Sequence, residues 1–157
     1  MPKFRRSIEI KAPLEQVFEF HLHPANVVLI APPVSKTTLL ATTDPVLKVG
    51  SRVTVRSIQA GLHVRMEAEV VALERARLLK DTQVYGPFRS WTHTHTFEPI
   101  EGGTRLTDHV EYALPLGLLG GLAMGRTVAR EIEAVFTYRQ ERTRLLLEGS
   151  HPPSVPG

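Results

Sequence analysis

The middle of the chain alternates apolar and polar residues, which is the pattern of β-strands that bury one face. Seven segments show it, and short turns containing glycine or proline separate most of them. We expect strands at 4–11, 36–42, 52–58, 63–73, 78–85, 88–97 and 104–114. Turns this short join antiparallel neighbours, so we expect the strands to form one antiparallel meander.

Apolar residues at helical spacing occur in three places. Those between Leu14 and Leu22, after Pro13, predict a first short helix. A second short helix is expected from Pro24 to Ile30, because the prolines from Pro32 onward stop it. A long helix closes the chain, and its apolar residues fall on one side: Val128, Ile132, Val135, Phe136 and Leu146.

This order of elements predicts an α+β architecture. Only the last helix is long enough to cover the sheet, so we expect a curved antiparallel sheet of seven strands wrapped around it. The wedge between sheet and helix, roofed by the two short helices, predicts an internal cavity. We expect residues 1–149 to form this single domain and residues 150–157, which are rich in proline, to form a disordered tail.

Three segments carry a resemblance to known proteins. They are LKDTQVYGPF at 79–88, WTHTHTFEP at 91–99, and GGTRLTD with YALPLG at 102–108 and 112–117. Together with the element order, they resemble the helix-grip fold of the START-like (SRPBCC) superfamily, in a bacterial subgroup similar to polyketide cyclase/dehydrases and lipid-transfer proteins. The resemblance implies a cavity for a hydrophobic ligand such as a lipid, a quinone or a polyketide, with catalysis in only some members.

Composition narrows the classes of partner. The 157 residues include no cysteine, which excludes disulfides and thiol chemistry, and the net charge is only +3. Arginines are spread along the chain instead of forming a dense patch, so we expect no nucleic-acid binding. We see no signal peptide and no apolar run long enough to span a bilayer, so we expect a cytoplasmic protein.

The candidate chemistry centres on the alternating residues 91–97. Two aromatic residues bracket two histidines on one strand face, and three threonines fill the other. On the neighbouring strands, the same alternation places polar residues among large apolar ones. If these faces all look toward the long helix, one polar network lies on the cavity wall: Asp81, Gln83, His93, His95 and Asp108.

Two interpretations of this network are open. Buried polar groups that satisfy one another can fix strand register inside an apolar core. Alternatively, a few polar anchors in an apolar cavity orient a ligand. In that case the network binds the ligand together with aromatic and aliphatic walls: Phe18, Val28, Trp91, Phe97, Tyr112, Ile132 and Phe136.

Catalysis is the leading alternative to binding. His93 or His95, oriented by Asp108, could act as an acid/base group in cyclisation or dehydration. The His-x-His pair could also bind a metal with Asp108 as third ligand. That motif is short and its aromatic flanks indicate a core, so we expect neither a metal nor another cofactor. The other histidines, His21 among them, show no such pattern.

Two features near the long helix also have functional interpretations. Residues 116–125, LGLLGGLAMG, predict a flexible apolar approach to the helix that could gate the cavity or touch a membrane. Arg139 falls near the apolar stripe, where it needs a carboxylate such as Asp81 or Asp108, an anionic ligand group, or an escape past the helix edge. The expected partners are a small hydrophobic molecule and, transiently, a membrane. After ligand binding and catalysis, the third function class that we consider is a protein- or membrane-interaction module.

Overall fold

The computed structural model describes residues 1–149, so the tail predicted at 150–157 lies outside the described residues. A strand, two short helices, six strands and a long helix follow one another, as predicted. They are β1 (Lys3–Ile10), α1 (Leu14–Leu22), α2 (Val27–Ile30), β2 (Thr38–Thr42), β3 (Arg52–Gln59), β4 (Leu62–Glu74), β5 (Leu78–Tyr85), β6 (Ser90–Ile100), β7 (Gly103–Ala113) and α3 (Gly117–Glu148). Single 3-10 turns flank α2 at Pro24–Asn26 and Pro33–Ser35.

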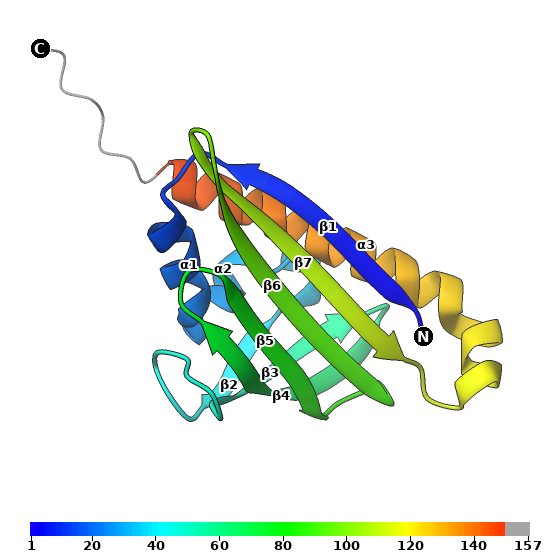
Figure 1. Cartoon of the computed structure of the whole chain (residues 1–157). Coiled ribbons are helices and arrows are strands. Elements are labelled where there is room, and N and C mark those ends of the chain that lie inside the picture. The colour runs from blue at the N-terminus through cyan, green and yellow to red at the C-terminus, as the bar shows by residue number, and fades with distance from the viewer. Residues whose placement is uncertain (150–157) are drawn as a thin grey trace, which may run out of the picture.

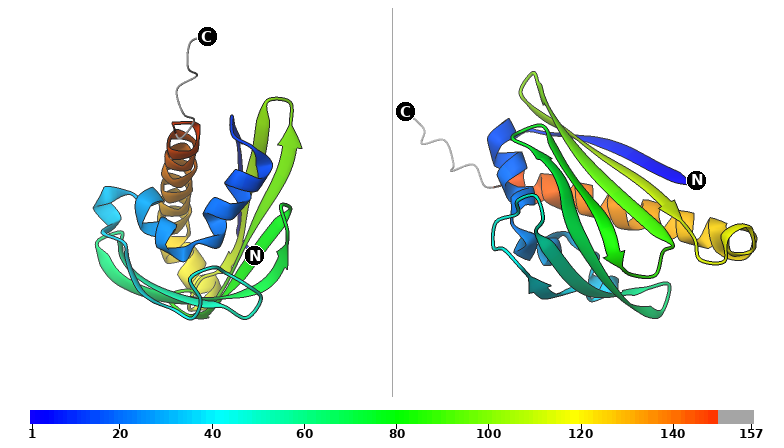
Figure 2. Two further views of the ribbon diagram at one scale, coloured as in Figure 1. Left: turned by 90° about the vertical axis from the view of Figure 1, so that its left-hand side faces the viewer. Right: turned by 60° about the horizontal axis from the view of Figure 1, so that its bottom comes forward.

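The strands form one curved antiparallel sheet around α3 (Figure 1). Its order is β1-β7-β6-β5-β4-β3-β2, so the first two strands in the sequence are the two edges. Figure 2 shows the sheet as a trough that holds α3, with α1 and α2 at one end. This is the helix-grip arrangement, and it leaves space between the sheet and the helix.

The register of the β6–β7 hairpin determines which polar residues lie opposite each other in the sheet. Its turn uses Gly102 with φ of +79°, a conformation that glycine adopts without strain. The pairing then runs without a bulge along the hairpin and places His95 opposite Asp108. On the other side of β6, the β5 register places Asp81 opposite His93. The two histidines of β6, two residues apart, therefore each lie opposite an acid on a different neighbouring strand.

The apolar core has two parts with polar residues between them. Phe18 of α1 packs edge-on against Phe97 of β6 in the first part, with ring centroids 5.3 Å apart. Phe136 of α3 belongs to the second part. His93 contacts Phe136, and the His95 ring stacks on Phe97. The two histidines thus join the core parts instead of filling either one.

The sequence prediction for residues 116–125 is wrong in its local structure. These residues are the first turns of α3, which begins at Gly117 directly after Leu116 in the left-handed conformation. Their leucines are exposed on turns that extend past the strand ends (Figure 1). No helix within residues 1–149 is both long and apolar enough to cross a bilayer.

Candidate functional site

Two adjoining cavities lie between the sheet and the helices. The smaller, about 180 Å³, has a polar wall that includes Asp81, His93 and His95. The larger, about 290 Å³, is lined mainly by apolar residues of β3, β4 and α3. The two cavities share wall residues: Val27, Val55, Met66, Trp91 and Arg139. The two cavities therefore adjoin, and one of them has a polar wall while the other is mainly apolar.

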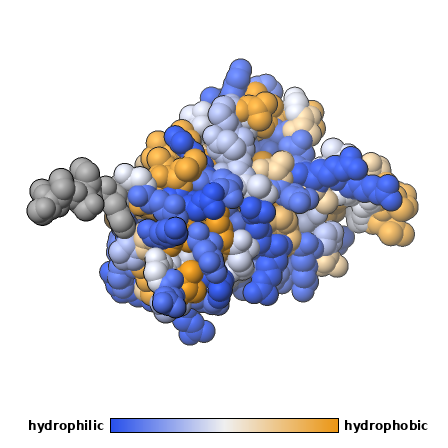
Figure 3. All heavy atoms as spheres, turned by 90° about the horizontal axis from the view of Figure 1, so that it is seen from above, coloured by the Kyte–Doolittle hydropathy of each residue, from blue (hydrophilic) through white to orange (hydrophobic). Residues whose placement is uncertain are grey.

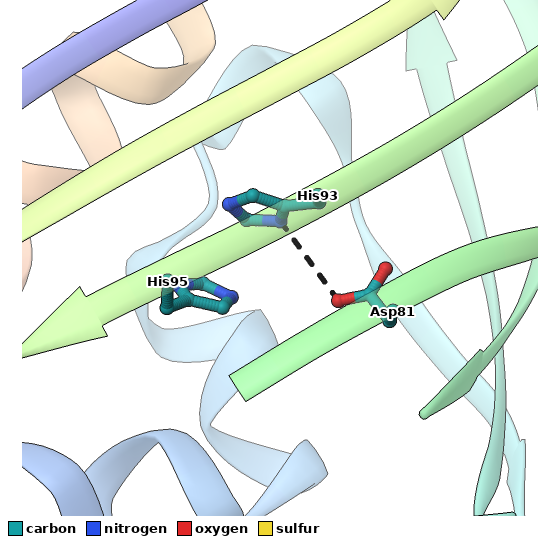
Figure 4. A group of neighbouring side chains, drawn as sticks. All are labelled: Asp81, His93 and His95. Carbon is teal, nitrogen blue, oxygen red and sulfur yellow. Dashed lines mark ion pairs between the residues drawn. The ribbon is translucent and has the colours of Figure 1, made fainter. Parts of the chain in front are cut away.

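Two carboxylates hold the two imidazoles from opposite sides at the polar wall. His93 Nε2 lies 2.7 Å from Asp108 Oδ1, while its Nδ1 lies 4.0 Å from Asp81 Oδ2 (Figure 4). His95 Nδ1 lies 2.9 Å from the same Asp108 oxygen, without the alignment of a hydrogen bond. Each ring thus turns one nitrogen toward Asp108 and leaves the other on the cavity side.

Asp108 is buried and is fixed by a third contact from α3. Gln140 Nε2 donates to Asp108 Oδ2 at 2.7 Å and to the Arg6 carbonyl at 2.9 Å. Burial on its own raises the pKa of Asp108, but its close contacts with His93 and His95 hold it well below its ordinary value. Asp108 is therefore an ionised acceptor that orients both rings.

The environment of the two histidines favours their neutral form. Burial lowers the pKa of both His93 and His95 below the ordinary value, and Asp108 only partly opposes this. A neutral imidazole has one N–H and one lone pair. Because the Nε2–H of His93 donates to Asp108, the lone pair lies on Nδ1, on the side of Asp81.

Asp81 is the other carboxylate of the site, and it differs from Asp108. Its side chain is 22% exposed, and within residues 1–149 no hydrogen-bond donor reaches its carboxylate. Burial raises its pKa to about 6, although His95 and Arg139 oppose this. Asp81 is therefore the acid of the site that has free acceptor capacity.

The structure adds His21, which the sequence interpretation left without a role. Helix α1 places its ring 5.1 Å from the His95 ring, on the wall of the smaller cavity. Its Nδ1 bonds the Val17 carbonyl at 2.7 Å, and burial lowers its pKa to about 3. The available signal was its spacing, four residues after Val17 on the apolar side of the helix.

Arg139 lies at the junction of the two cavities. Its guanidinium carbon is 5.1 Å from the centre of the Phe136 ring, a cation–π contact. Burial lowers its pKa, and Asp108 and Asp81 act on it only through longer-range charge. Within the described residues, no carboxylate lies within 4.0 Å of this guanidinium. It therefore has no direct ion pair.

Several predicted wall residues do line the cavities, and others are core. Trp91, Ile132 and Phe136 line the larger cavity, and Trp91 reaches both. The remaining four wall candidates lie elsewhere: Phe18 and Phe97 pack on each other, Tyr112 packs on Phe88, and Val28 is exposed.

Gln83 does not join the network that the alternation predicts. Its Nε2 donates to the Phe88 carbonyl at 2.7 Å, and its Oε1 accepts from the Phe88 amide at 3.3 Å. The side chain therefore closes the β5–β6 turn with both ends of its amide. Gly86 allows this, because a Cβ there would lie 2.4 Å from Gln83 Oε1.

Comparisons with known proteins agree with this fold. The family described as "Polyketide cyclase / dehydrase and lipid transport" matches residues 1–142. Protein CV1439 from Chromobacterium violaceum has a similar structure, with a TM-score of 0.73, 15% identity, and coverage of 94% of this chain and 99% of that one. Protein Ms6760 from Mycobacterium smegmatis gives a TM-score of 0.71 and 21% identity, covering 95% and 92%.

A third structural relative comes from a biosynthetic pathway. The di-domain ARO/CYC protein StfQ of the steffimycin pathway gives a TM-score of 0.72 and 12% identity, covering 94% of this chain and 50% of that one. No curated protein matches the chain in sequence. Identities this low demonstrate a shared fold and leave function to be argued from the site.

Proposed function

Because this chain belongs to the polyketide cyclase/dehydrase and lipid transport family, we propose that it binds a small hydrophobic molecule with an oxygen-bearing polar end, such as a lipid, a quinone or a polyketide. The adjoining cavities support this, since one is mainly apolar and the other carries the polar groups. Small-molecule sites are commonly built in this way, with apolar walls and a few polar anchors.

Arg139 is the observation that carries the proposal. A guanidinium on a cavity wall without an ion-pair partner is costly, because its charge has lost part of its hydration. An acidic or carbonyl oxygen of a ligand at the junction supplies the missing acceptor. We place the polar end of the ligand beside Arg139 and its apolar part in the larger cavity, against Trp91 and Ile132.

Binding of a fluorescent long-chain fatty acid tests this placement. Replacing Arg139→Gln should weaken the affinity about tenfold to a hundredfold, since a hydrogen bond to a charged group contributes about 1.5–3 kcal/mol. The matched control is Arg142→Gln, an exposed arginine on the same helix, which should leave affinity unchanged. Mass spectrometry of an organic extract of the purified protein would identify the ligand class.

Three results would contradict or redirect the proposal. Equal affinity of Arg139→Gln and wild type would remove Arg139 as the anchor. Failure of wild type to bind fatty acid, quinone or polyketide probes would reject hydrophobic-ligand binding. Turnover of a polyketide substrate that His95→Ala abolishes, while binding is kept, would make the protein a cyclase/dehydratase-type enzyme.

We infer that the ligand enters from a membrane surface at the start of α3. The exposed apolar side chains there are Leu116, Leu118, Leu119, Leu122 and Met124. Met124 also lines the larger cavity, so this surface adjoins the ligand space. Arg126 and Arg130 are exposed on the next turns and complement anionic lipid. Figure 3 shows apolar atoms gathered at this end of the molecule.

A further inference from the structure

The polar wall of the smaller cavity carries a second arrangement, which hydrophobic-ligand binding does not require. Asp81, His93 and His95 each present one potential ligand atom, and these three atoms lie within 4.8 Å of one another. Figure 4 shows the three side chains converging from β5 and β6. We propose that they bind a single divalent transition-metal ion, with Zn²⁺ as the reference ion.

The donor set suits such an ion. Two neutral imidazoles and one carboxylate are ligands that Zn²⁺ and related ions accept, whereas Mg²⁺ and Ca²⁺ prefer oxygen alone. The ligand nitrogen of His93 is Nδ1, since Nε2 donates to Asp108. For His95 we assign Nε2 as the ligand nitrogen, because Nδ1 faces Asp108 at 2.9 Å. Both free nitrogens lie on the cavity side with Asp81.

Asp108 is placed to orient the ligands. From the sequence we considered Asp108 as the third ligand of a metal that we did not expect; in the structure it lies behind both rings, on the nitrogens that face away from the proposed ion. A carboxylate that receives the second N–H of a ligating histidine fixes the ring and increases its basicity. Gln140 in turn fixes Asp108 with a hydrogen bond of 2.7 Å.

The three ligand atoms, which lie within 4.8 Å of one another, must move closer together to bind one ion. Two ligands bonded to Zn²⁺ at about 2.0–2.2 Å lie roughly 3.0–3.5 Å apart, compared with 4.0 Å between His93 Nδ1 and Asp81 Oδ2. The sheet register holds the backbones of both residues directly opposite each other. Because no hydrogen bond within residues 1–149 restrains the Asp81 carboxylate, its rotation can close the difference.

The surroundings leave coordination positions open. Three protein ligands with a cavity of about 180 Å³ beside them match the open kind of metal site, in which water or a ligand atom completes the shell. Asp81 and Asp108 together balance the charge of a divalent ion. A ligand oxygen bound near Arg139 would then lie within the cavity that the ion adjoins, where the ion would polarise it.

Titration of the chelator-treated, metal-free full chain with Zn²⁺ alone tests the site. Calorimetry should find one ion per chain, and Asp81→Asn should weaken binding at least tenfold while keeping the side-chain shape. Asp108→Asn should weaken it about tenfold to a hundredfold, the usual effect of losing a group that orients a ligand. His63→Ala removes an exposed histidine of β4 and should change nothing.

Two spectroscopic readouts locate the ion. Imidazole ¹⁵N NMR should show shifts at His93 Nδ1 and His95 Nε2 on Zn²⁺ addition, and Co²⁺ should develop visible absorption that Asp81→Asn abolishes. The proposal is overturned if wild type binds no Zn²⁺ at micromolar concentration, or if Asp81→Asn binds as tightly as wild type. Equal weakening by His63→Ala would show adventitious binding only. Fatty-acid binding by the metal-free protein tests the ligand proposal separately.

Discussion

At the scale of single residues, Asp108 organises the site. It is one of the most buried acids of the described chain, and three side chains from two elements converge on it: His93, His95 and Gln140. A buried charge of this kind is tolerated because its neighbours satisfy it. The hydrogen bond from His93 selects the tautomer of that ring, and the contact of His95 Nδ1 with Asp108 leaves the other nitrogen of His95 on the cavity side.

Replacing Asp108→Asn should therefore destabilise the fold. The amide cannot accept from all three neighbours, and it removes the charge that the site is built around, so we expect a loss of about 2–4 kcal/mol in the free energy of unfolding. Urea denaturation in the presence of a chelator measures it. Glu111→Gln, a half-exposed acid on the same strand, should cost less than about 1 kcal/mol. A loss equal to that of Glu111→Gln would show that the neighbours do not depend on the charge.

Strand alternation was sufficient to predict His93, His95, Asp81 and Asp108 on inward faces, because side chains of a strand have a period of two. It could not separate Asp108 behind the rings from Asp81 in front, since that difference depends on register. Gln140 escaped prediction because a polar residue on a long helix normally faces water. Its contact with Asp108 exists only once α3 lies across β7.

At the scale of elements, the start of α3 departs most from its sequence pattern. Glycines weaken a helix, yet this segment is helical. The position of Gly120 explains why a glycine occurs in this helix, because Gly120 is buried against the preceding turn. A Cβ at Gly120 would lie 1.9 Å from the Pro115 carbonyl oxygen, whereas one at Gly121 would meet nothing within 4 Å. One glycine is thus required by contact and its neighbour is not.

Gly120→Ala and Gly121→Ala should consequently have opposite effects. The first forces the turn before α3 to move and should cost about 1–3 kcal/mol. The second removes backbone freedom from the unfolded chain and should add up to about 1 kcal/mol. Thermal unfolding of both variants measures the difference. Stabilisation by Gly120→Ala would show that the helix does not pack on Pro115 as described.

Strands and helices were otherwise predicted to within about three residues, because alternation and short turns are local signals. The sheet order followed from the same turns. The pattern missed one feature of the tertiary structure. The first turns of α3 extend past the sheet, and their leucines are exposed. Hydrophobicity indicates burial only when a partner surface exists, and within the described residues none covers these leucines.

At the scale of the whole molecule, the larger cavity and the exposed apolar end of α3 adjoin at Met124, which is the arrangement that our proposal of membrane uptake needs. The double variant Leu118→Ser/Leu122→Ser should reduce binding to vesicles of mixed neutral and anionic lipid at least tenfold, since each buried leucine contributes about 1.5–3 kcal/mol. Co-sedimentation measures this. Leu145→Ser, exposed near the other end of α3, is the matched control.

Fatty-acid affinity in solution should not change in the double variant, because neither leucine lines a cavity. This separates uptake from binding. Vesicle binding that is equal in wild type, the double variant and Leu145→Ser would contradict membrane contact at this end of the molecule. Equal binding of wild type to neutral and to anionic vesicles would instead remove the contribution of Arg126 and Arg130.

The position of β1 at the sheet edge beside β7 has a consequence for how the chain is made. On the ribosome, β1 emerges first, yet its partner is the last strand to be synthesised. Ser7 of β1 bonds Thr107, which lies 100 residues later in the chain. Synthesis of those 100 residues takes roughly 5–20 s at ordinary rates of translation. Throughout that interval β1 is an unpaired strand edge. Its exposed charged residues, such as Lys3, Arg5 and Glu9, keep such an edge from pairing with other nascent chains.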